Sequence, residues 1–167
     1  MHVTSSGSAK VTLPADDQIL VTREFDAPKH LVYKAFTTPE LVRRWWHANR
    51  GEMTVAEIDL RVGGKWRYVM VADGGMEVGF HGEYREIVPN EQIVSTETFE
   101  GLPEGVSEED GTTVNIATFA ETDGRTTLTL LIQAPSRETR DAIVDSGMEA
   151  GLQDALDNLE QVAVSLD

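Results

Sequence analysis

The last thirty or so residues, 136–166, constrain the fold of this chain more than any other stretch. Apolar side chains recur there at steps of three and four residues, at Met148, Leu152, Ala155, Leu159, Ala163 and Leu166. This spacing is typical of one face of an α-helix, and the acidic residues between them predict a wet opposite face. Ser136 follows Pro135 and is of the type that caps helix N-termini. The sequence therefore predicts a single long helix over residues 136–166.

Two glycines, Gly147 and Gly151, lie one turn apart in this predicted helix. Each costs about 1 kcal/mol relative to alanine in a helix interior, so their presence needs a reason. A strand or an aromatic ring could approach the helix backbone closely at this point. Alternatively, the missing side chains could leave open volume between the helix and a sheet. The spacing alone leaves both explanations open.

Upstream of the helix, the apolar period is two, which is typical of β-strands. Strands are predicted at 17–25, 53–61, 65–72, 77–87, 91–100, 112–121 and 126–133. Two short helices, starting near Pro28 and Thr38, follow the first strand. The short links between later strands predict an antiparallel meander, whose apolar face only the last helix is long enough to cover. We therefore predict an α+β fold, with a curved seven-stranded sheet around the C-terminal helix.

The chain length of 167 residues predicts one domain. Residues 1–15, MHVTSSGSAKVTLPA, are rich in Ser, Gly and Thr and are expected to form a flexible N-terminal tail. Residues 16–167 are expected to form the domain.

Composition excludes several classes of function. Fourteen basic against twenty-nine acidic residues give a formal charge of −15, which argues against nucleic-acid binding. No apolar run approaches the ~20 residues of a membrane-spanning helix, and the N-terminus lacks a signal-peptide pattern, so we expect a cytoplasmic protein. The absence of cysteine excludes disulfides and thiolate metal sites.

A ligand cavity between sheet and helix would be lined by the aromatic residues of the predicted interior. Such pockets are mostly apolar with a few placed polar groups. The alternative, that these rings only fill the core, remains open at this stage. The candidate ligand-binding residues are Trp45, Trp46, Trp66, Tyr68, Phe80, Tyr84, Phe99, Gly147, Met148, Gly151 and Leu152.

A catalytic or metal site is not expected. The four histidines show no metal-binding spacing, and no serine lies in a G-x-S-x-G motif. Only His47 and His81 are candidates for acid–base chemistry, and neither has an evident partner. His81 has the opposite strand parity to Phe80, so it is expected on the outer face. No cofactor, metal or catalytic residue is assigned.

Four segments of the chain resemble one known family. They are FDAPKHLVYKAFTTPELVRRWW, EIDLRVGGKWRYVM, FHGEYREIVPNEQIVSTETFEG and GMEAGLQDALDNL, in that order. Together they resemble the bacterial proteins related to the activator of the heat-shock protein 90 ATPase, within the START-like (SRPBCC) superfamily. The resemblance implies a helix-grip fold, in which an antiparallel sheet grips a long C-terminal helix.

The resemblance implies three possible functions. The first, which we expect, is binding of a small hydrophobic or amphipathic molecule. The second is stimulation of a chaperone ATPase by direct interaction, and the third is an enzyme of the cyclase or dehydratase kind. The chain departs from many relatives in having His47-Ala48 after Trp45-Trp46, and Leu152 where tryptophan is common. Both changes affect the expected pocket, so no relative's ligand can be transferred.

Overall fold

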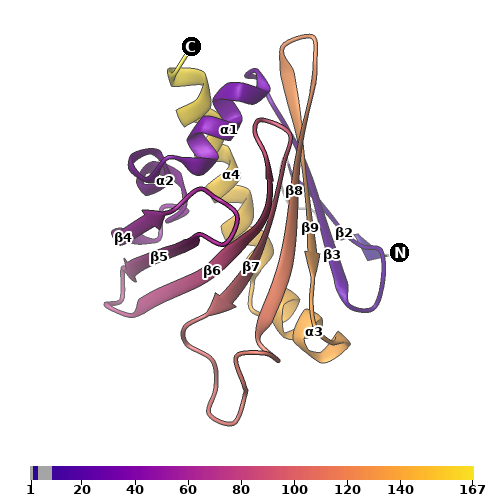
Figure 1. The fold of residues 1–167 in the computed structure, drawn as a ribbon. Coiled ribbons are helices and arrows are strands. Elements are labelled where there is room, and N and C mark those ends of the chain that lie inside the picture. The colour runs from indigo at the N-terminus through magenta and orange to yellow at the C-terminus, as the bar shows by residue number, and fades with distance from the viewer. Residues whose placement is uncertain (1, 4–8) are drawn as a thin grey trace.

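The computed structural model of this protein describes residues 2–3 and 9–167, and in them shows one nine-stranded sheet curved around a long helix (Figure 1). The strands are β1 His2–Val3, β2 Lys10–Leu13, β3 Gln18–Phe25, β4 Gly51–Ile58, β5 Lys65–Ala72, β6 Glu77–Val88, β7 Gln92–Phe99, β8 Thr112–Thr122 and β9 Arg125–Gln133. The helices are α1 Lys29–Thr37, α2 Pro39–Trp45, α3 Arg137–Asp145 and α4 Met148–Ser165. The predicted α+β helix-grip fold is confirmed.

The sheet is antiparallel throughout, in the order β1-β2-β3-β9-β8-β7-β6-β5-β4. Strands β4 to β9 follow one another as the predicted meander, and β3 joins it by pairing with β9. In Figure 1, α4 lies behind the curved sheet, and α1 and α2 lie at its upper end. One face of the sheet therefore surrounds α4, and the other faces solvent.

The strand count differs from the predicted seven because the sheet continues into the expected tail. Strand β2 pairs with β3, with Val11 opposite Val21, and the side chains of Ala9 and Val11 are only 1% exposed. The flexible-tail prediction is therefore wrong for this part of residues 1–15, whereas residues 1 and 4–8 lie outside the described residues. A four-residue strand, KVTL, is too short to show a period of two.

The predicted C-terminal helix is two helices. Ser136 caps α3, since its hydroxyl accepts a hydrogen bond from the Thr139 N–H at 3.1 Å. The chain then breaks at Gly147, which has φ +85° and occupies the N-cap position of α4. The placement of Gly147 in a helix interior was wrong, because this left-handed conformation ends one helix before the next begins. Apolar spacing continues across the break and so could not reveal it.

Polar contacts on two sides hold α4 against the sheet. Arg23 of β3 is 4% exposed, and its guanidinium contacts Asp157 at 2.7 Å and Glu160 at 3.4 Å. The amide of Gln153 accepts from the Ala9 N–H at 2.9 Å and donates to the Ala9 carbonyl at 2.7 Å. These contacts fix where the helix lies, while its apolar face enters the core through Ala155, Leu156, Leu159, Val162 and Ala163.

The two glycines are expected to respond to alanine with opposite signs. An added Cβ at Gly151 would meet no atom within 4 Å, so Gly151→Ala should raise the free energy of unfolding by up to about 1 kcal/mol through helix propensity. Gly147→Ala should lower it by about 1 kcal/mol, because alanine is strained at positive φ. Urea denaturation of both variants measures this. Equal effects of the same sign would contradict the helix break.

Gln153→Ala tests whether β2 depends on α4. The variant leaves the N–H and carbonyl of Ala9 unpaired in a buried environment, so we expect a loss of about 2 kcal/mol in the free energy of unfolding. Gln161→Ala, at an exposed position of the same helix, is the control and should change stability by less than about 0.5 kcal/mol. Indistinguishable denaturation midpoints for the two variants would show that the paired hydrogen bonds contribute nothing.

Candidate functional site

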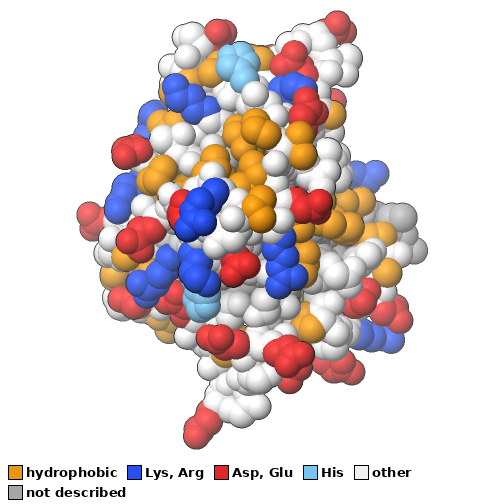
Figure 2. Space-filling model, in the orientation of Figure 1, with side chains coloured by type: hydrophobic (Ala, Val, Ile, Leu, Met, Phe, Trp, Pro, Cys, Tyr) orange, Lys and Arg blue, Asp and Glu red, His pale blue; other side chains and the backbone are white. Residues whose placement is uncertain are grey.

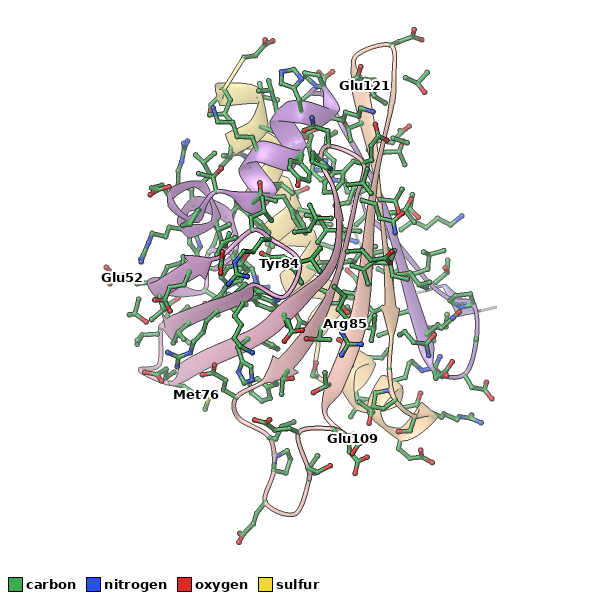
Figure 3. The ribbon with its side chains drawn as sticks, in the orientation of Figure 1. Glu52, Met76, Tyr84, Arg85, Glu109 and Glu121 are labelled. Atoms are coloured by element: carbon green, nitrogen blue, oxygen red, sulfur yellow. The ribbon has the colours of Figure 1, made fainter. Side chains whose placement is uncertain are left out.

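A cavity of about 350 Å³ lies between the inner face of the sheet and α4. Strands β5 to β9 form one wall and α4 forms the opposite wall. The wall is completed by Phe36 of α1, Trp45 at the end of α2, and Trp46, His47, Ala48 and Arg50. Tyr84 lies in the middle of the sheet (Figure 3), whereas Met76 and Glu121 lie at turns on its margins. The cavity therefore lies at the centre of the concave face of the sheet, where α4 does not fill the space that the sheet encloses.

Nine of the eleven candidate ligand-binding residues lie on the wall of this cavity. They are Trp45, Trp46, Trp66, Tyr68, Phe80, Tyr84, Met148, Gly151 and Leu152. Phe99 does not line the cavity: it is the last residue of β7, is 36% exposed and contacts Phe80 with ring centroids 5.1 Å apart. Gly147 is also outside the cavity wall, because the helix break turns the chain there.

The aromatic rings of the wall contact one another at defined angles. Trp46 makes edge contacts with Tyr68 and Phe80, at centroid distances of 5.6 and 5.7 Å. Trp66 is tilted against Tyr68 at 4.8 Å, and its indole Nε1 donates to the Thr96 carbonyl at 3.2 Å. Such offset contacts hold the rings in place and leave some ring surface turned toward the cavity. The wall is thus aromatic on its β5–β6 side.

Strands β7 and β8 bring polar side chains to the same wall, which the sequence analysis did not find. Ser95, Glu97 and Asn115 line the cavity among aliphatic residues. Burial raises the pKa of the Glu97 carboxyl, and a hydrogen bond with the Asn115 side chain opposes part of this rise. The parity of β7 was ambiguous in the sequence, because Thr96 and Thr98 on the opposite parity are also polar. A carboxyl in the inward register of an otherwise apolar sheet was the available signal.

Tyr68 and Tyr84 both lie on the β5–β6 side of the wall. Burial raises the pKa of both phenols well above the ordinary value. The charges of Tyr84 and Glu97 are lesser causes of the rise in the pKa of Tyr68. Both tyrosines therefore stay neutral at physiological pH and act only as hydrogen-bonding groups.

Two groups that can carry positive charge, His47 and Arg50, lie on the wall between α2 and β4. The Nδ1 atom of His47 accepts from the Asn49 N–H at 2.9 Å, so the neutral ring carries its proton on Nε2. The Arg50 side chain is 45% exposed and pairs with Asp154 of α4 at 2.8 Å. This exposure indicates that Arg50 lies at the mouth of the cavity, where a satisfied ion pair joins α4 to the loop.

His81 lies outside the cavity, on the outer face, as its parity predicted. Contrary to the expectation of no partner, its Nδ1 atom lies 2.9 Å from Glu100, which also binds the Arg67 guanidinium at 2.8 and 2.9 Å. The Arg67 and His81 contacts hold the pKa of the Glu100 carboxyl at about 2. This cluster is a surface ion-pair network. The described residues hold no group of His, Asp and Glu that could bind a metal ion.

Charges of both signs are interspersed on the face shown in Figure 2, without a continuous basic surface. This agrees with the acidic composition, which argues against contact with a nucleic-acid backbone. Among the helices of the described chain, none is both long and apolar enough to cross a membrane.

Comparison with known proteins identifies the family. The model of the activator of Hsp90 ATPase homolog 1-like proteins matches residues 26–163. The chain belongs to this family. No match was found among curated proteins.

Solved structures of bacterial proteins show the same fold. A protein from Rhodobacter sphaeroides is 22% identical with a TM-score of 0.84, covering 95% of this chain and 99% of its own. One from Chromobacterium violaceum is 27% identical with a TM-score of 0.76, covering 89% and 98%. An AHSA1-like protein from Aeromonas hydrophila is 21% identical with a TM-score of 0.65, covering 88% and 93%. The family and the helix-grip fold are thus established.

Glu100→Gln tests the electrostatics of the outer cluster. The folded-state pKa of about 2 lies below the ordinary value of 4.5, so ionised Glu100 stabilises the fold above pH 4.5 and this contribution is lost as the pH falls toward 2. The half-exposed setting limits the effect, and we expect the variant to lose about 1 kcal/mol at pH 7. The difference from wild type should shrink between pH 5 and pH 3.

Urea denaturation at intervals from pH 7 to pH 3 measures this difference. Glu83→Gln is the control, because the Glu83 carboxylate pairs with Lys65, whose side chain is 80% exposed, at 3.5 Å. A difference that stays constant with pH in Glu100→Gln would show that its carboxylate has an ordinary pKa.

Proposed function

We propose that this protein binds a small apolar or amphipathic molecule in the cavity between the sheet and α4. The observation that carries the proposal is the cavity itself: about 350 Å³, lined by aromatic and aliphatic side chains with a few polar groups. Volumes of this order and linings of this kind are typical of small-molecule sites.

The alternative from the sequence, that the aromatic residues only fill the core, fits the structure less well. Interiors of proteins are close-packed, and an empty apolar space forfeits the dispersion contacts of the atoms around it. At Gly151, an added Cβ would meet nothing within 4 Å. This supports the open-volume explanation for Gly151, whereas the helix break accounts for Gly147.

The aromatic wall and the mouth are suited to an amphipathic occupant. Trp46 and Leu152 lie on the cavity wall and remain half-buried, so a ligand could contact both while one end reaches solvent near Arg50. The rings of Trp46, Tyr68 and Phe80 offer a surface against which a flat or branched apolar body can pack.

Leu152→Trp tests the proposal by reducing the cavity volume. N-phenyl-1-naphthylamine, a neutral apolar fluorescent probe, should bind the wild-type protein saturably. We expect Leu152→Trp to weaken this binding at least tenfold, because the larger ring occupies part of the cavity. Gln161→Trp places the same ring on the exposed side of α4 and should leave the affinity unchanged.

Fluorescence titration measures the affinities, and urea denaturation shows whether each variant is folded. If the wild type does not bind the probe saturably, or if the two tryptophan variants bind it equally, the cavity is not the binding site and the proposal is wrong.

A further inference from the structure

The cavity holds one carboxyl group, Glu97, and its surroundings indicate what the ligand carries. The register that pairs His81 with Thr98 and Tyr84 with Ser95 places Gly82 opposite Glu97. Trp66 pairs with Gly82 from the other side, and its indole covers this glycine: a Cβ there would lie 2.6 Å from the Trp66 Nε1. The bare position at Gly82 therefore lets the Trp66 indole lie over the strand position that faces Glu97, and both side chains line the cavity.

The carboxyl of Glu97 has no cationic partner among the residues that the structure describes. None of the ion pairs formed by the described residues includes Glu97. Arg50, on the cavity wall, is engaged by Asp154 and by the Ala48 carbonyl at 2.7 Å. Asn115 gives Glu97 a hydrogen bond through its side chain, while its Oδ1 atom accepts from the Thr113 hydroxyl at 2.9 Å. One hydrogen bond does not compensate a negative charge in an apolar cavity.

The same cavity wall offers aromatic faces. Trp46, Trp66, Tyr68 and Phe80 line it together with Glu97. A cation that lies over aromatic rings is attracted by their negative faces, most strongly when it is removed from water. A carboxylate beside aromatic rings is therefore a setting in which a ligand cation is stabilised twice, by charge pairing and by the rings.

This inference rests on the proposed function. We propose that the ligand carries a cationic nitrogen, as a protonated amine or a quaternary ammonium group. The nitrogen pairs with Glu97 between the aromatic rings, while the apolar body of the ligand fills the rest of the cavity. The ligand thereby supplies the partner that the fold does not. Anionic head groups are disfavoured at this depth because they would face the Glu97 carboxylate.

A matched pair of probes tests the charge. Phenyltrimethylammonium and tert-butylbenzene have the same shape, with a cationic nitrogen in one and a carbon in the other. Glu97→Gln keeps the shape of the side chain and removes its charge. We expect Glu97→Gln to weaken phenyltrimethylammonium at least tenfold and to change tert-butylbenzene less than twofold. Glu100→Gln removes a carboxylate from the outer face and should leave both affinities within twofold, which controls for the net charge of the protein.

Calorimetric titration measures each affinity, and the outcomes separate the two proposals. If tert-butylbenzene binds and phenyltrimethylammonium does not, or if Glu97→Gln weakens both equally, the cationic ligand is ruled out while the apolar cavity stands. If neither probe binds the wild type, both proposals are wrong. Acetophenone tests a protonated Glu97 that donates to a carbonyl: binding that survives in Glu97→Gln, whose amide also donates, and is lost in Glu97→Leu would overturn the cation assignment.

A measurement that does not use Glu97→Gln keeps the proposal testable if that variant does not fold. The charge of phenyltrimethylammonium does not titrate, and burial raises the pKa of the Glu97 carboxyl, so its affinity should fall as the pH falls from 8 to 4 and protons compete for Glu97. The other charged or titratable groups of the wall are His47, Arg50, Tyr68 and Tyr84. The fall should persist in His47→Gln. An affinity independent of pH in that variant would overturn the proposal.

Discussion

The structure depends on how α4 covers the concave face of one curved antiparallel sheet. Burial of apolar surface drives the helix onto the sheet, but polar contacts decide how far it can approach. Arg23 holds Asp157 and Glu160 on one side, Gln153 holds the backbone of Ala9, and Arg50 holds Asp154 near the mouth. A helix fixed at its flanks in this way cannot move into the centre of the sheet. The space that remains there is the cavity.

The same constraint explains the N-terminal strand and the helix break. Strand β2 extends the sheet so that Ala9 reaches Gln153, which gives α4 a partner on the side away from the meander. At the other end, the positive φ of Gly147 redirects the chain, so that α3 lies beside the sheet end while α4 crosses the concave face. Neither feature touches the cavity, yet both decide where its helical wall lies.

The sequence predicted most of this architecture because its signals are local. The period-two strands β3 to β9 and the start of α3 at Ser136 were within a few residues of the structure. The break at Gly147 was missed because the apolar residues on either side of it keep the three- and four-residue spacing of one continuous helix. Strand β2 was missed because its stability comes from Val21 and Gln153, which are distant in sequence.

The cavity wall was predicted only in its apolar part, for a similar reason. Aromatic residues of strands can be assigned to an interior by parity alone, and Trp66, Tyr68, Phe80 and Tyr84, which parity assigned there, lie on the wall. Phe99 failed because parity does not indicate where a strand leaves the sheet interior. Glu97 and Asn115 escaped notice because a polar residue inside a sheet is informative only when a cavity is known to lie in front of it.

Glu97 also bears on whether the cavity serves the packing of the fold or the recognition of a ligand. A leucine at this position would match the neighbouring wall residues Leu130 and Ile132 and would avoid the desolvation of a carboxyl group. Nor does Glu97 join the sheet to α4, since the contacts that do so run through Arg23, Gln153 and Arg50. The carboxyl thus weakens an interior that is otherwise built for apolar contact. Under the proposal made above, a ligand of opposite charge offsets this cost, and the carboxyl of Glu97 then serves recognition and not packing.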